Sequence, residues 1–234
     1  MLYWIILGAV FIISWLVSAR LRSKFEEYSQ VGLHSGLTGK EAAEMMLKSY
    51  GIYDVQVTCV PGELTDHYNP LEKTVNLSES VYYGSSAASV AVAAHECGHA
   101  VQHATAYSML QFRSALVPLQ NASATILNII MLFSFVGSFM LYNTIPIHII
   151  LWIIVGAYSI MTLFSLVTLP VEFDASRRAL AWMTERGIVN QQEKDMAKDA
   201  LFWAAMTYVV AAIGSLSMLA YYVFQLIGAS GDDE

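Results

Sequence analysis

Charged residues are scarce in this chain and are absent from long stretches of it. Only 13% of the 234 residues are Asp, Glu, Lys or Arg, whereas soluble domains carry about 25%. None occurs in residues 1–19, 114–171 or 200–231. Because 56% of the chain is hydrophobic, runs of this kind exclude an ordinary soluble globular protein and favour one embedded in a lipid bilayer.

These charge-free runs divide into about four membrane-spanning helices. One span needs about 20 apolar residues, so the first and last runs supply one span each. The middle run is long enough for two, and a polar turn at residues 143–146 divides it. The predicted spans are residues 2–18, 124–142, 147–169 and 201–227. The sequence therefore predicts a mainly α, polytopic membrane protein.

The basic residues indicate how these spans are oriented. All 12 Lys and Arg lie in residues 20–113 or 177–198, and such residues collect on the cytoplasmic side. Four spans place both segments inside the cell and both termini outside, with the acidic tail 232–234 away from the basic side. We therefore expect a multi-pass protein of the cell membrane (inner or plasma membrane).

A cleaved signal peptide is the alternative for the N-terminus. Val17-Ser18-Ala19 fits the small-residue rule for cleavage. However, no basic residue precedes the apolar run, and Arg20 follows it at once. These flanks favour a retained span.

The low number of cysteines and the lack of a basic cluster limit the possible disulfides and binding partners. The chain has only Cys59 and Cys97, both on the predicted cytoplasmic side, so we expect no disulfide. Its net charge is −7 and no basic cluster occurs, which argues against a nucleic-acid partner. The lipid bilayer is the expected partner, and the sequence leaves the oligomeric state open.

The cytoplasmic part reads as a small α+β region with one later helix. Thr38-Gly39-Lys40-Glu41 has the pattern of a capping box, and Gly51 suits the end of that helix. Residues 73–77 form a candidate strand that either offers a sheet edge to a peptide or pairs with 54–60. The predicted segments are residues 20–113 with strands 54–60 and 73–77 and a helix at 85–104, and a helical segment at 170–199.

The helix at 85–104 contains the motif His95-Glu96-Cys97-Gly98-His99. Residues four apart lie on one face of a helix, so His95 and His99 can bind one Zn²⁺ together. Glu96 adjoins the first ligand, where a carboxylate can take a proton from a water that the metal activates. This is the HExxH arrangement of zinc peptidases.

A catalytic zinc site needs a third protein ligand. His103 continues the histidine stripe, but it lies about 12 Å from His95 along an unbroken helix. It is therefore expected to support or pack against the site. Glu172 is the leading candidate, since it is the first charged residue after the middle apolar run, where the third span meets the cytoplasm.

The order of four segments resembles the YugP-type membrane zinc metallopeptidases and, more distantly, HtpX-type gluzincins. The segments are LTDHYNP (64–70), VNLSESVY (75–82), AAHECGHAVQH (93–103) and LPVEFDASRRAL (169–180). The resemblance covers nearly the whole chain. It implies a zincin-like metallopeptidase fold with one Zn²⁺ on His95, His99 and Glu172 and with Glu96 as general base.

One position departs from the gluzincin pattern, and one role stays open. The gluzincin Asp four residues after the ligand Glu, which orients a zinc-binding His, is Ser176 here, so either Asp174 substitutes for it or this contact is weaker. The residue that stabilises the oxyanion is open. His67, beside Asp66, is the candidate, and its rivals are Arg177, Tyr68 and Tyr82.

The sequence thus predicts a membrane-embedded zinc endopeptidase whose cytoplasmic site cleaves peptides or membrane proteins. The membrane-protein substrate rests on the HtpX resemblance alone. The alternative is a non-catalytic scaffold or adaptor with a structural zinc, which would need a fourth protein ligand. An ion transporter is disfavoured, because His148 is the one ionisable His, Asp, Glu, Lys or Arg within the predicted spans.

Overall fold

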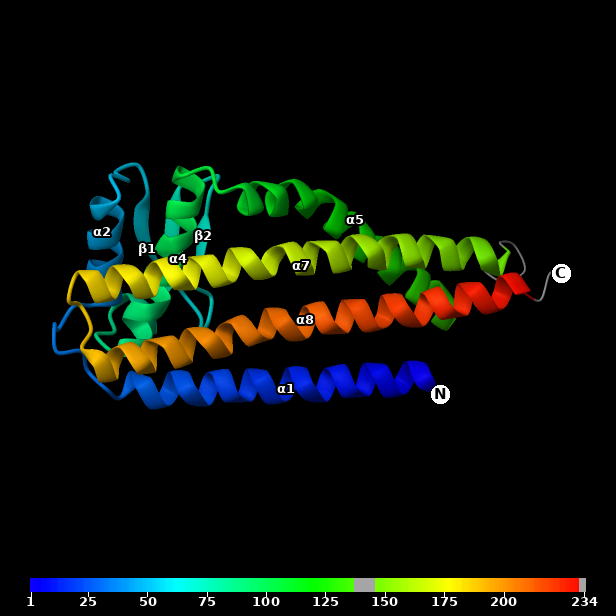
Figure 1. The fold of residues 1–234 in the computed structure, drawn as a ribbon, viewed down its shortest axis with the longest axis horizontal. Helices are drawn as coiled ribbons and strands as arrows, with labels where there is room; N and C mark the ends of the chain where they lie inside the picture. Colours follow the sequence, from blue (N-terminus) through cyan, green and yellow to red (C-terminus); the bar gives the residue numbers. More distant parts are fainter. Residues whose placement is uncertain (137–145, 232–234) are drawn as a thin grey trace. The chain divides into compact units, whose positions relative to one another are not determined.

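The computed structural model describes residues 1–136 and 146–231 and is mainly helical (Figure 1). In chain order its elements are α1 (Leu2–Ser29), α2 (Gly39–Ser49), β1 (Gln56–Val60), β2 (His67–Asn69), β3 (Thr74–Ser78), α3 (Glu79–Tyr82), α4 (Ala87–Ala104), α5 (Ser108–Val136), α7 (Ile147–Glu185) and α8 (Gln191–Gly231). The predicted fold class, mainly helical with a small α+β part, is confirmed.

Within the described ranges, four helices are long and apolar enough to cross a membrane, namely α1, α5, α7 and α8. This agrees with the predicted number of spans. The polar turn expected at 143–146 lies outside the described residues except for Pro146, and so does the acidic tail 232–234.

The long helices run further than the apolar segments in them. Helix α5 begins at Ser108, ahead of the expected span start at 124. Helix α7 continues through Pro170 to Glu185, and Gly187 then turns the chain with φ +64°. The segment expected as one helical part at 170–199 is therefore shared between the end of α7 and the beginning of α8.

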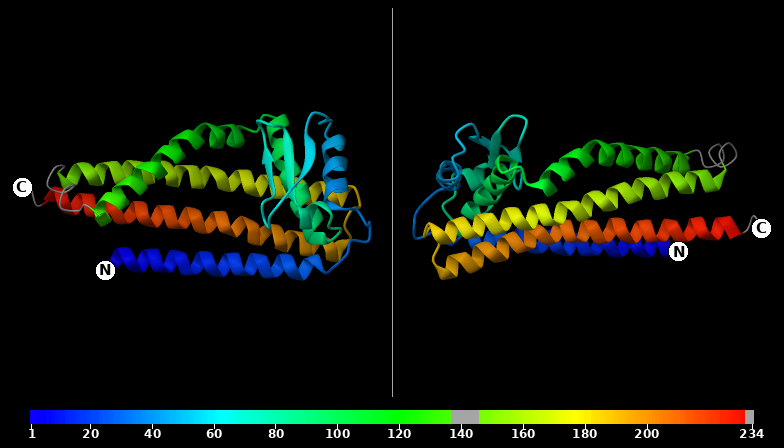
Figure 2. Two further views of the ribbon diagram at one scale, coloured as in Figure 1. Left: turned by 180° about the vertical axis from the view of Figure 1, so that it is seen from behind. Right: turned by 45° about the horizontal axis from the view of Figure 1, so that its top comes forward.

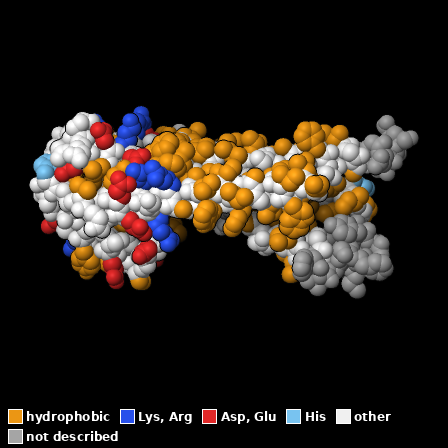
Figure 3. Space-filling view, turned by 90° about the horizontal axis from the view of Figure 1, so that it is seen from below, with side chains coloured by type: hydrophobic (Ala, Val, Ile, Leu, Met, Phe, Trp, Pro, Cys, Tyr) orange, Lys and Arg blue, Asp and Glu red, His pale blue; other side chains and the backbone are white. Residues whose placement is uncertain are grey.

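The chain forms two compact units. We call residues 1–14, 112–168 and 208–234 the span unit, and residues 15–111 and 169–207 the sheet unit. On the face shown in Figure 3, hydrophobic side chains cover the spans, and acidic and basic side chains gather over the sheet unit. This division matches the charge-free runs, because the bilayer core excludes unpaired charges.

The sheet has three strands in the order β1-β3-β2. Strand β3 pairs parallel with β1 and antiparallel with β2. Of the two alternatives for residues 73–77, pairing with 54–60 is confirmed, and the sheet edge was wrong because β3 is the central strand. The short strand β2, which the sequence did not reveal, lies at an edge instead.

Helices α2 and α4 pack together against this sheet (Figure 2). The predicted capping box begins α2, where the Thr38 side chain accepts from the Glu41 backbone N–H and Glu41 reaches back to the Thr38 backbone N–H. Met46 of α2, Leu77 of β3 and Cys97 of α4 are fully buried in this core. The core therefore fixes α4, the helix that contains HExxH, on a rigid support.

Candidate metal centre

Helix α4 places the two motif histidines side by side. Ser86 caps its first turn by accepting from the Ser89 backbone N–H. The small residues that follow let α4 sit deep in the sheet unit, so that His99 is buried and His95 half-buried. The two imidazole rings meet edge to face with centroids 4.8 Å apart, as expected for residues i and i+4 of one helix.

Glu172 of α7 completes this cluster. Its Oε2 lies 3.3 Å from His95 Nε2 and 3.5 Å from His99 Nε2, and its side chain is 2% exposed. The three candidate ligand atoms all lie within 4.8 Å of one another. The cluster therefore joins two segments that are more than 70 positions apart in the sequence.

A close helix contact at Gly98 makes this approach possible. A Cβ at Gly98 would lie only 2.7 Å from the backbone oxygen of Ala175 and 3.0 Å from its Cα. Such distances leave no room for a side chain, so the glycine lets the backbones of α4 and α7 touch. Glu172 lies one turn before Ala175 and is thereby brought to the two histidines.

Each histidine uses its second ring nitrogen for a contact that orients it. His95 Nδ1 lies 3.0 Å from Ser176 Oγ, and His99 Nδ1 lies 3.0 Å from Gln102 Oε1. Ser176, at the position of the gluzincin Asp, thus makes the contact to His95. Asp174 accepts hydrogen bonds from Gln102 and Arg178 instead. Sequence reasoning missed Gln102, although its position three residues after His99 on one helix was the available signal.

Glu96 lies beside the cluster and next to the sheet edge. It is buried, and its Oε2 accepts a hydrogen bond of 3.0 Å from the Tyr68 backbone N–H. Tyr68 is the middle residue of β2. The edge strand β2 therefore fixes the carboxylate of Glu96.

Comparison with known proteins agrees with this geometry. The model of a family described as "Putative neutral zinc metallopeptidase" matches residues 3–227. The chain belongs to this family. It is also 40% identical over 224 residues to the "Putative membrane protease YugP" of Bacillus subtilis (strain 168), a match that covers 95% of this chain and 94% of the relative. No solved structure matches the chain.

The donor set fits the metal that the neutral zinc metallopeptidase family implies. Two imidazoles and one carboxylate are a usual set for catalytic zinc, and donors about 2.0–2.1 Å from a tetrahedral ion lie about 3.3 Å apart. The distances from Glu172 Oε2 to the two Nε2 atoms are 3.3 and 3.5 Å. Both carboxylate–imidazole distances thus already suit ligands of one ion, and all three donor atoms lie within 4.8 Å of one another.

The charge of Glu172 also acts on His99. Burial by itself would lower the pKa of His99, but hydrogen bonding to Glu172 and its negative charge raise that pKa above the ordinary value. The carboxylate therefore favours positive charge at this point, whether that charge is a proton or a metal ion.

The structure does not bring His67 into the metal cluster. His67 is exposed, with Nδ1 2.8 Å from the Thr65 carbonyl oxygen and Nε2 3.1 Å from Asn76 Nδ2. Asp66 accepts hydrogen bonds from the backbone N–H and hydroxyl of Ser78 instead of orienting this ring. Burial raises the pKa of Asp66, and the bonds from Ser78 oppose that rise.

His103 and Cys97 also point away from the cluster. His103 Nδ1 lies 2.8 Å from the Tyr68 hydroxyl. Cys97 is buried on the opposite side of α4, with Sγ 3.6 Å from the Ala43 carbonyl oxygen, and burial raises the pKa of its thiol. Both cysteines are free, as expected.

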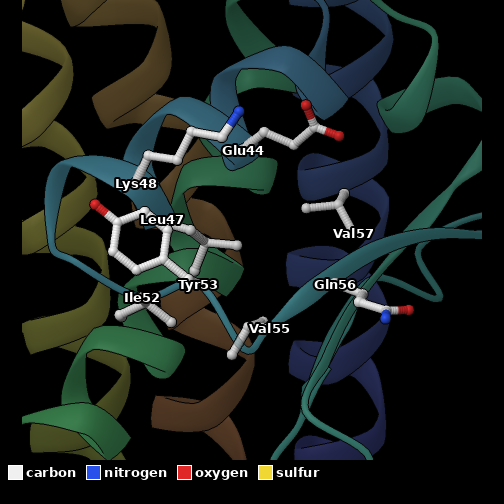
Figure 4. Close-up of a pocket in the computed structure, with 8 residues that line it drawn as sticks. All are labelled: Glu44, Leu47, Lys48, Ile52, Tyr53, Val55, Gln56 and Val57. Carbon is white, nitrogen blue, oxygen red and sulfur yellow. The ribbon is translucent and has the colours of Figure 1, made fainter.

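A separate pocket of about 420 Å³ lies between α2 and β1 (Figure 4). Glu44 and Lys48 stand on its α2 side, and Val55 and Val57 on its strand side. None of the candidate ligands lines it. The cluster of His95, His99 and Glu172, and not this pocket, is therefore the candidate metal site.

Proposed function

We propose that this protein is a membrane-embedded zinc-dependent endopeptidase in which Glu96 is the general base. The observation that carries this proposal is the cluster of His95, His99 and Glu172, whose donor atoms lie within 4.8 Å of one another. Glu96 adjoins it on the same helix. Membership of a zinc metallopeptidase family supports the same reaction class.

In this proposal the metal ligands, the general base and the residue that orients the base have separate roles. His95, His99 and Glu172 would hold one Zn²⁺, which when bound supplies a Lewis acid that polarises the scissile carbonyl and lowers the pKa of water. Glu96 takes the proton of the attacking water and passes it to the leaving amine. The Tyr68 N–H fixes the Glu96 carboxylate for that transfer.

The substrate is a peptide, and strand β2 is its proposed docking edge. Extended peptides add to exposed sheet edges through backbone hydrogen bonds. In the described part of the chain β2 is an edge strand, and its Tyr68 amide touches Glu96. A peptide alongside β2 would therefore pass the general base. His67, at the start of β2, stays the proposed oxyanion donor, a role that requires its ring to leave Asn76.

A structural zinc site is less well supported. Such a site is closed by four protein ligands. Among the described residues, the cluster of His, Cys, Asp and Glu contains three members. A position left for water or substrate favours catalysis over a scaffold role.

Glu96→Gln tests the mechanism directly. Gln keeps an oxygen that accepts from the Tyr68 N–H, so we expect zinc content and thermal stability near wild type. Removing the base should lower cleavage of a casein substrate by about 10²–10⁴-fold. The measurements are zinc analysis and a protease assay on purified protein, with and without a chelator.

Glu44→Gln is the matched control, because Glu44 lies on α2 in the separate pocket. This variant should cleave casein as wild type does. Full activity of Glu96→Gln would exclude the proposed mechanism.

A further inference from the structure

Gln102 is a fully buried polar residue that contacts both helices of the cluster. Its Oε1 lies 3.0 Å from His99 Nδ1 on its own helix. Its Nε2 donates to the Val171 carbonyl oxygen at 2.8 Å and to Asp174 Oδ2 at 3.0 Å, both on α7. Every polar atom of this side chain therefore has a partner, in an interior where an unpaired amide would be destabilising.

The partners on α7 decide which way the amide faces. A backbone carbonyl can only accept hydrogen bonds, so the NH₂ group of Gln102 must point toward Val171 and, beside it, Asp174. Arg178 Nε donates to the same Asp174 oxygen at 2.6 Å. The amide oxygen is then left to face His99.

The direction of the amide in turn decides the tautomer of His99. An amide oxygen accepts only, so His99 Nδ1 must carry a proton. Nε2, the nitrogen that faces Glu172, is then the ring nitrogen left to bind a metal. Ser176, by contrast, can donate or accept, and its contact with His95 leaves that tautomer undecided.

We infer that Gln102 is a positioning residue that holds His99 in the tautomer able to bind the metal through Nε2. Residues Asp174 and Val171 enforce this by fixing the amide. The inference rests on the proposed metal site and adds a determinant of metal affinity outside the three ligands. Contacts of this kind change metal affinity by about 10–100-fold.

Two substitutions at Gln102 separate this role from a purely structural one. Gln102→Met keeps the volume but removes the acceptor for His99 and the donations to α7. Gln102→Glu restores an acceptor for His99 but still cannot make both donations, and it places a second carboxyl group beside Asp174. A residue that only ties α4 to α7 would therefore be at least as damaged by Glu as by Met.

Zinc titration of the purified full-length proteins, with thermal unfolding of the metal-free forms, is the experiment. We expect Gln102→Met to bind zinc at least about tenfold more weakly than wild type, and Gln102→Glu to bind it more tightly than Gln102→Met. A smaller loss in the Met variant, or a Glu variant no tighter than Met, would overturn the inference. Ser89→Ala, which removes a buried hydroxyl at the far end of α4, should bind zinc as wild type does.

A second measurement needs no variant at position 102 to fold. In zinc-bound wild-type protein with ¹⁵N-labelled histidine, NMR should show His99 with its proton on Nδ1 and with Nε2 bound to the metal. A proton on Nε2 would overturn the inference. Wild-type protein that binds no zinc would instead refute the proposed function, so the two failures are distinguishable.

Discussion

At the scale of single residues, the candidate site depends on a carboxylate that is buried between two imidazoles. Glu172 is 2% exposed and lies within 3.5 Å of both Nε2 atoms. A buried carboxylate is tolerated only with such partners. Its position beside both imidazoles supports the proposal that it is the third metal ligand and not an interfacial acid that only caps a helix.

We therefore predict that Glu172→Ala lowers zinc affinity by more than the 10–100-fold that is typical of residues around metal ligands. His103→Ala should leave zinc affinity near wild type, because His103 bonds to the Tyr68 hydroxyl. Zinc titration of both purified variants checks this. If His103→Ala lost the metal and Glu172→Ala kept it, the ligand assignment would be wrong.

At the scale of elements, the close packing of α4 on α7 controls whether the ligands can meet. Gly98 sits where a Cβ would lie 2.7 Å from the Ala175 backbone oxygen. Backbone cannot move aside as a flexible side chain can. The helices would have to separate by a few tenths of an ångström or more.

Gly98→Ala should therefore destabilise the protein by about 1–3 kcal/mol, although Gly→Ala inside a helix normally stabilises it by about 1 kcal/mol. It should also weaken zinc binding, because Glu172 moves with α7. Thermal unfolding and zinc titration measure the two effects. Gly156→Ala in α7 is the control, since nothing lies within 4 Å of its added Cβ; equal behaviour of both variants would contradict this packing argument.

At the scale of the whole molecule, the distribution of charge predicts how the chain crosses the membrane. Four helices in the described residues are candidate spans, and all 12 Lys and Arg lie in two segments of the sequence. An even number of spans places both termini on one side. The positive-inside rule then predicts that the sheet unit, with the metal cluster, lies in the cytoplasm.

Reporter fusions test this topology. A reporter that is active only in the cytoplasm should work after Lys24 and should be silent after Asn143 and after Glu234. A cytoplasmic signal from the C-terminal fusion would overturn the predicted orientation or the number of spans.

The sequence by itself determined the membrane character, the number of candidate spans and the histidine pair. These features are local, because apolar runs and an i, i+4 spacing are properties of contiguous residues. The capping box at Thr38 and the helix around HExxH follow from equally local patterns. The resemblance to zinc metallopeptidases, which the family match confirms, relied on the order of such segments.

Only the tertiary structure decided which side chains surround those histidines. Glu172 was expected at the site, but its distance to both rings depends on how closely α7 approaches Gly98. The edge position of β2, the contact of the Tyr68 amide with Glu96 and the link from Gln102 to Asp174 all join segments that are distant in the sequence. Such contacts depend on how helices and strands pack, and no local pattern specifies that packing.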